Sequence, residues 1–87
     1  MPPIEEPPPD NPYVEEPDTD FAPLGELATE EADAQAEQLR EAIRYHDYRY
    51  YVAADPVIAD RTYDALFDRL EPLEDEFDLA TADSPTR

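Results

Sequence analysis

The spacing of apolar residues predicts a helix from about Glu30 to Val52 or Ala53. Apolar and aromatic side chains, together with one histidine, recur there at intervals of three and four residues, the period of a single helix face. These positions are Ala32, Ala36, Leu39, Ile43, His46 and Tyr50. We expect Thr29 to be the N-cap, since its hydroxyl can accept a hydrogen bond from the first turn. The helix should stop at Asp55-Pro56, because proline drives the preceding residue out of the helical region.

A second helix is predicted after the short linker Asp55–Ala59, with Asp60 as its N-cap. Its apolar face comprises Tyr63, Leu66, Phe67, Leu70, Leu73 and Phe77. Pro72 falls inside this pattern and costs about 3 kcal/mol in a regular helix interior, so we expect a kink or a break there. Two helices joined by a short linker pack as an antiparallel pair. The fold class predicted is therefore all-α, a small helical hairpin.

Residues 1 to 28 form an arm of different composition. They hold eight of the 11 prolines and eight acidic residues, with no basic residue. Such a segment buries too little apolar surface to offset its ordering entropy, so we expect a disordered, partly extended arm. Tyr13 and Phe21 are interpreted as solvated, docking on a partner being the alternative. The predicted organisation is thus an arm over 1–28 and a helical domain over 29–87.

The charge of the chain restricts its partners. It has 24 acidic residues against six arginines, no lysine and no cysteine, and a net charge of −18. The sign is wrong for nucleic acid or an anionic membrane, and lysine or thiol nucleophiles are excluded within this chain. With no signal peptide or membrane span in the sequence, a cytoplasmic location is expected. High salt would screen the repulsion, which favours a halophilic source; a disordered acidic protein is the alternative.

Candidate chemistry concentrates where the two predicted helices meet. Asp60, Tyr63 and Asp64 share one helix face, opposite the tyrosine-rich end of the first helix. Aromatic faces and carboxylates suit a small polar ring that carries positive charge. The alternative is a capped, solvated helix start, which needs no ligand. His46 has no second histidine or cysteine near it, so a core or boundary position is favoured over a metal ligand.

The stretch Arg44–Asp64 resembles the N-terminal helical domain of NAD-dependent DNA ligases. That family has a Tyr-Tyr or Tyr-His pair, an Asp-Pro turn and then Asp-x-x-Tyr-Asp. Here these positions are Tyr50-Tyr51, Asp55-Pro56 and Asp60-Arg61-Thr62-Tyr63-Asp64. The closing DSPTR also resembles the family's link into its adenylation domain, and the resemblance covers about residues 35–87.

The resemblance implies a domain that binds the nicotinamide mononucleotide (NMN) half of NAD and closes it over the adenylation domain of the same ligase. A lysine there attacks the α-phosphate and releases NMN, the first step of nick sealing in DNA replication and repair. Tyr50 and Tyr51 would contact the nicotinamide side, and Asp60, Tyr63 and Asp64 would hold the ring and ribose. Arg61 and Thr62 belong to the same cofactor-binding motif.

By the same resemblance, this stretch carries no catalytic residue and no metal, and magnesium and zinc are expected only in the rest of the enzyme. The domain would be monomeric, with no direct contact to nucleic acid and none to a membrane. The sequence stops before any Lys-x-Asp-Gly motif, so we expect a fragment of a larger enzyme.

Two departures from the family pattern stand out. Pro72 replaces an ordinary helix residue, and the acidic arm has no counterpart in typical bacterial members, which together with the charge suggests a haloarchaeal ligase. The competing hypothesis is a non-catalytic helical hairpin that docks on a basic partner through its tyrosines.

Overall fold

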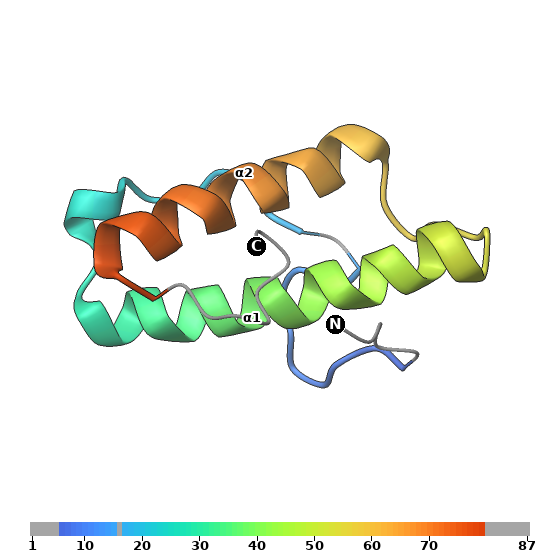
Figure 1. Ribbon diagram of the computed structural model, residues 1–87, viewed down its shortest axis with the longest axis horizontal. Coiled ribbons are helices and arrows are strands. Elements are labelled where there is room, and N and C mark those ends of the chain that lie inside the picture. Colours follow the sequence, from blue (N-terminus) through green and yellow to red (C-terminus); the bar gives the residue numbers. More distant parts are fainter. Residues whose placement is uncertain (1–5, 16, 80–87) are drawn as a thin grey trace.

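Two helices lie side by side and run in opposite directions (Figure 1). The computed structural model describes residues 6–15 and 17–79. Helix α1 spans Thr29–Asp47 and continues into a π-helical turn, η2, over Tyr48–Val52. Helix α2 spans Asp60–Phe77, and a single 3-10 turn, η1, covers Leu24–Glu26 ahead of α1. The predicted all-α hairpin, preceded by a proline-rich acidic arm, is confirmed.

The core lies between the two helices, where the predicted apolar faces meet. Its fully buried side chains come from both helices at the expected three- and four-residue spacing; they are Ala32, Ala36, Leu39, Ala42, Ile43, Leu66, Leu70 and Leu73. Burying a leucine or isoleucine side chain contributes about 1.5–3 kcal/mol. The hydrophobic periodicity therefore accounts for both the helices and their pairing.

Both predicted N-caps are wrong by one residue. Thr29 and Asp60 are already helical, and the extended residues that precede the helices are Ala28 and Ala59. In α1, the Glu31 carboxylate accepts a hydrogen bond from the Ala28 N–H at 3.0 Å, so the first turn is closed from inside the helix. At α2 no side chain caps the helix start, so the Asp60 carboxylate is not used in capping.

Of the kink or break predicted at Pro72, the break is wrong, because α2 continues through Pro72 to Phe77, and the kink stays a prediction. Pro72 lies on the exposed side of the helix and so does Asp68, whose carbonyl loses its helical donor. Water can bind that carbonyl, which lowers the cost of the missing hydrogen bond. The helix ends at Asp78, whose φ of 54° is left-handed, and the Leu79 N–H donates to the Glu74 carbonyl at 2.8 Å. This is the hydrogen bond of a Schellman motif.

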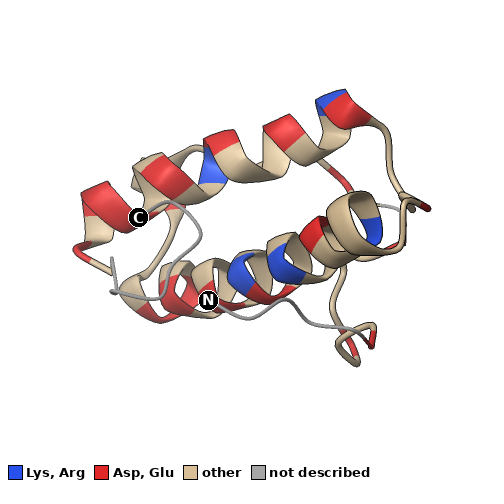
Figure 2. Cartoon of the chain, turned by 45° about the vertical axis from the view of Figure 1, so that its right-hand side comes forward, with Lys and Arg blue, Asp and Glu red and all other residues tan. Residues whose placement is uncertain are grey.

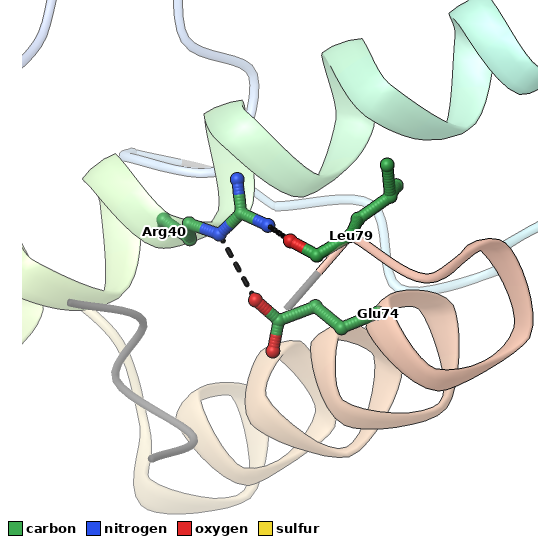
Figure 3. A network of polar contacts seen from close by, with 3 residues as sticks. All are labelled: Arg40, Glu74 and Leu79. Atoms are coloured by element: carbon green, nitrogen blue, oxygen red, sulfur yellow. Dashed lines mark hydrogen bonds and ion pairs between the residues drawn. The ribbon is translucent and has the colours of Figure 1, made fainter. Parts of the chain in front are cut away.

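A buried ion pair joins the helices, and we call this group of three residues the Arg40 junction. Arg40 Nε donates to Glu74 Oε2 at 3.0 Å, and Arg40 Nη2 donates to the Leu79 carbonyl at 2.5 Å (Figure 3). The Glu74 side chain is 0% exposed and that of Arg40 is 12% exposed. One guanidinium thus fixes both α2 and the chain that leaves it.

The described part of the arm lies against the hairpin. Tyr13 and Val14 are buried in the core, and the Tyr13 carbonyl accepts a hydrogen bond from His46 Nε2 at 2.8 Å. The Phe21 ring packs on Tyr13 and lies beneath the Arg69 guanidinium, 5.0 Å from its centroid. The interpretation of Tyr13 and Phe21 as solvated residues is therefore wrong, because Tyr13 is buried and Phe21 is partly buried against the core. An aromatic ring in a proline-rich segment still gains by covering apolar surface. Disorder of the arm in solution stays a prediction.

Acidic residues spread along both helices, while arginines occupy only a few turns (Figure 2). The predicted core position of His46 is confirmed, since its side chain is buried beneath the arm. No helix in residues 6–15 and 17–79 is long and apolar enough to cross a membrane.

Candidate functional site

A hollow of about 200 Å³ opens where η2 faces the first turns of α2. We call this region, η2 with the first turns of α2, the site end of the hairpin. The hollow is lined by two residues of η2 and three of α2, namely Tyr50, Tyr51, Asp60, Tyr63 and Asp64. A larger hollow, of about 480 Å³, lies within the arm and is lined mostly by prolines and acidic residues. Only the smaller one combines aromatic rings with carboxylates.

The π-helical turn places the first two lining residues. The predicted end of the first helix at Val52 is right, but its last turn is π-helical rather than α-helical, with the Ala53 N–H donating to the Tyr48 carbonyl at 2.9 Å. A left-handed residue, Ala54 at φ 53°, then turns the chain toward α2. Arg49 stabilises this turn through hydrogen bonds to the Asp55 carbonyl at 2.9 Å and its carboxylate at 2.6 Å. Single π turns are frequent at functional sites.

Two tyrosine–carboxylate hydrogen bonds connect the helices at the site end. The Tyr50 hydroxyl of η2 donates to Asp60 Oδ1 of α2. The Tyr63 hydroxyl of α2 donates in the opposite direction, to Asp47 Oδ1 of α1, at 2.5 Å. Since a phenol has one hydrogen to donate, neither tyrosine has a donor left for a ligand. What they offer is the face of the ring.

The rings form a continuous aromatic wall. The centroids of Tyr50 and Tyr51 are 5.4 Å apart, those of Tyr50 and Tyr63 6.4 Å, and Phe67 stacks on Tyr63 at 6.4 Å. Burial, and then the Asp47 carboxylate, raise the pKa of Tyr63 well above its usual range, so its hydroxyl stays protonated. Tyr51 differs from the others, because its side chain is 76% exposed.

Five of the seven residues predicted for the cofactor site line the hollow. The other two, Arg61 and Thr62, lie beside it on the first turn of α2, Arg61 exposed and Thr62 half-buried. Sequence reasoning did not single out Asp47, which binds the Tyr63 hydroxyl. The available signal was its position one helical turn before Tyr50 and Tyr51, at the end of a face that points to the second helix.

The acceptors of the hollow are only partly used within the protein. Asp60 accepts the Tyr50 hydroxyl at Oδ1, while Asp64 makes no hydrogen bond or ion pair with any residue of the described ranges. Carboxylates and aromatic faces without a donor of their own select ligands that bring donors and positive charge. Among the described residues, no group of three histidine, cysteine or acidic side chains could hold a metal ion.

The fold and this hollow define a small helical domain whose hollow has the chemistry to accept a cationic, hydroxyl-bearing ligand. The comparison with known families makes this specific. Residues 29–87 match the family described as DNA ligase-like, N-terminal NAD+-binding domain, and the chain belongs to that family. No solved structure matches the chain.

Curated relatives are named DNA ligase. The chain is 62% identical to the one from Halorubrum lacusprofundi over 92% of this chain and 11% of the relative. For Natronomonas pharaonis the identity is 60% over 94% of this chain and 12% of the relative. For the bacterium Aquifex aeolicus it is 56% over 70% of this chain and 9% of the relative. Nothing in these comparisons supports the hypothesis of a non-catalytic interaction module.

The chain corresponds to a small part of each relative. It spans about a tenth of the length of the relatives it matches. The Natronomonas match covers 82 of the 87 residues, so it can begin no later than residue 6. It therefore includes the described arm. The resemblance seen in the sequence is confirmed, including its haloarchaeal character.

Proposed function

We propose that the hollow at the site end binds the NMN half of NAD+, and that in a longer ligase this domain presents NAD+ to an adenylation domain. The observation that carries the proposal is the convergence of Tyr50, Tyr51, Asp60, Tyr63 and Asp64 on one hollow. They come from two segments separated by a linker, and both segments lie within residues 29–87, which match the NAD+-binding family.

The chemistry of the hollow fits a nicotinamide riboside group. A pyridinium ring carries positive charge, and aromatic faces favour such a cation by about 0.5–2 kcal/mol each. Ribose hydroxyls are donors, and the free oxygens of Asp60 and Asp64 can accept from them. The occupied hydroxyls of Tyr50 and Tyr63 make the rings serve as apolar faces rather than as donors.

The size of the hollow supports a half-site. Complete small-molecule sites usually enclose about 300–1,000 Å³, whereas this one measures about 200 Å³ and is open to solvent on the side of Tyr51. A second surface is therefore needed to enclose a dinucleotide. We propose that the adenylation domain of the same ligase supplies it.

NAD+ would supply the adenylyl group that is transferred, with NMN as its leaving group. The residues of this chain would bind and orient the nicotinamide side only. Magnesium and zinc would be bound elsewhere in the ligase, and the enzyme would seal nicks in DNA replication and repair in the cytoplasm of a halophilic cell. The domain itself would act without direct contact to DNA or membrane and as part of a monomer.

The test uses a ligase that carries this domain and two reactions. Asp60→Ala, Tyr63→Ala and Asp64→Ala are each assayed for enzyme adenylation by NAD+ and for sealing of a nick that already carries the adenylate. Losing a hydrogen bond to a charged group costs about 1.5–3 kcal/mol, so adenylation should fall about tenfold to a hundredfold in the two aspartate variants. Tyr63→Ala loses an aromatic face worth about 0.5–2 kcal/mol to a cation, so its loss should be smaller. Sealing of the adenylated nick should stay near wild type in all three.

Asp68→Ala is the matched control, because Asp68 is an exposed aspartate one turn further along α2 and outside the hollow. It should leave both reactions unchanged. Equal losses in the two reactions, in step with a lower melting temperature, would show that the three residues serve stability and not NAD+.

A further inference from the structure

One side chain that does not line the hollow nevertheless controls a ring that does. Asp47 is the last residue of α1, half-buried, and lies next to the π-helical turn. Its Oδ1 accepts the hydrogen bond of the Tyr63 hydroxyl at 2.5 Å, across a sequence separation of 16 residues. This short bond to a charged acceptor belongs to the stronger class of protein hydrogen bonds.

Three contacts fix the Tyr63 ring. Phe67 stacks on it, Tyr50 packs against it at a tilt of 47°, and Asp47 binds its hydroxyl. A phenol ring has two side-chain torsions, and the hydroxyl bond at its far tip restricts both. Burial and the Asp47 charge raise the pKa of Tyr63, which keeps the hydroxyl a donor to Asp47 at physiological pH.

We propose that Asp47 is a positioning residue of the nicotinamide site, which holds the Tyr63 ring with its face toward the bound pyridinium. The inference rests on the proposed function and extends it to a residue outside the hollow. Because Asp47 acts through Tyr63, loss of its acceptor oxygen has the same consequence as loss of the Tyr63 hydroxyl. An asparagine at this position keeps an acceptor oxygen and restores most of the function.

The alternative role for Asp47 is a structural one, holding α1 against α2, but other contacts already hold the two helices together. The Arg40 junction and the leucine core join α1 to α2 without any contribution from Asp47. A purely structural Asp47 would change stability and both ligase reactions together. A positioning Asp47 changes only the reaction that uses NAD+.

The experiment compares Asp47→Ala, Tyr63→Phe and the double variant in a ligase that carries this domain, with Asp33→Ala as control. Asp33 is an exposed aspartate of α1, far along the helix from the hollow. For Asp47→Ala we expect kcat/KM for adenylation by NAD+ to fall about tenfold, with sealing of an adenylated nick unchanged. Tyr63→Phe should lose a similar factor, and the double variant should lose no more than either single one.

Asp47→Asn should stay within about twofold of wild type, since it keeps the acceptor. The proposal is overturned if Asp47→Ala behaves like Asp33→Ala, if the losses of the two single variants multiply in the double one, or if both reactions fall together. Asp64→Ala, assayed in parallel, separates the two levels of inference. A loss for Asp64→Ala without one for Asp47→Ala rejects only the positioning role, while no loss for either variant rejects the NMN site itself.

Discussion

The Arg40 junction and the site end connect the same two helices, but they use charge in opposite ways. At the junction one carboxylate and one guanidinium are buried together, and each has its partner within the protein. At the site end the carboxylates of Asp60 and Asp64 belong to exposed residues, and among the described residues neither is paired with an arginine. Asp60 accepts a hydrogen bond from the Tyr50 hydroxyl, and Asp64 has no hydrogen-bond partner in residues 6–15 and 17–79.

The difference shows where the chain places its few basic residues. Six arginines serve 24 acidic residues, so most carboxylates cannot be neutralised within the fold. Arg40 is used in the interior, where an unpaired Glu74 would cost several kcal/mol. The carboxylates of the hollow remain available to a cation from outside. Two arginines, Arg49 and Arg61, also lie at the site end, but among the described residues neither is paired with a carboxylate of the hollow.

The strongest test of this comparison removes Glu74. In Glu74→Ala the Arg40 guanidinium loses its buried counter-ion, and the free energy of unfolding should fall by about 3 kcal/mol. Urea unfolding in molar potassium chloride measures it, with Glu76→Ala, an exposed residue two positions on, as control. If Glu74→Ala unfolds at the same midpoint as the control, the junction contributes no stability.

A second, smaller effect concerns the contact between His46 and the arm. Burial lowers the pKa of His46, although the hydrogen bond from Nε2 to the Tyr13 carbonyl acts in the opposite direction. A proton added at the buried Nδ1 finds no hydrogen-bond partner among the described residues. In the folded state the pKa of His46 lies below the unfolded value of about 6.5. The contribution of His46 to the free energy of unfolding is therefore fully present above about pH 6.5, and it is lost as the pH falls through the folded pKa.

We therefore expect the urea midpoint to drop between pH 7 and pH 5, and the Tyr13 ring to become exposed over the same interval, seen by NMR. His46→Gln should remove most of this pH dependence, and Asp33→Asn should keep it. A midpoint that does not change with pH in the wild-type chain would mean that the arm does not close over His46.

The smallest expected effect is a difference between the site end and the core of the hairpin in their response to salt. Screening shortens the reach of charge repulsion from about 10 Å at 0.1 M to about 3 Å at 1 M, and it acts more on exposed than on buried charges. Helix content, measured by circular dichroism, should rise from low salt to molar potassium chloride. Amides at the site end should gain more protection from exchange than those around Leu39 and Leu70. Helicity that stays flat or falls with added salt would contradict this.

The helices and their pairing could be predicted from the sequence because apolar spacing alone determines them. Leu39, Ile43, Leu66 and Leu70 are buried as their spacing requires. The lining of the hollow was predictable for a related reason: Asp60, Tyr63 and Asp64 share a face by helix geometry. Local periodicity thus accounts for most of the fold and for three of the five residues that line the hollow.

Contacts between distant residues could not be predicted. Nothing in the local pattern shows that Arg40 reaches Glu74, or that Tyr13 closes over His46, since both depend on how the segments come together. The pairing of Asp47 with Tyr63 is of the same kind. The N-cap error at α1 has another cause, because an alanine with extended backbone can begin a helix when a carboxylate of the first turn accepts its N–H. At α2 no side chain caps the helix start, so cap preferences could not locate it.

The π-helical turn makes the site depend on the number of residues as well as on their kind. A π turn holds about one residue more than an α turn, and each residue of an α-helix rotates the next by about 100°. Removing one residue between Tyr48 and Val52 would let the turn return to α geometry and would carry the following aromatic side chain to a different side of the helix. A variant with every tyrosine and aspartate intact would then lose the hollow. In evolution this short segment should therefore accept substitutions more readily than insertions or deletions.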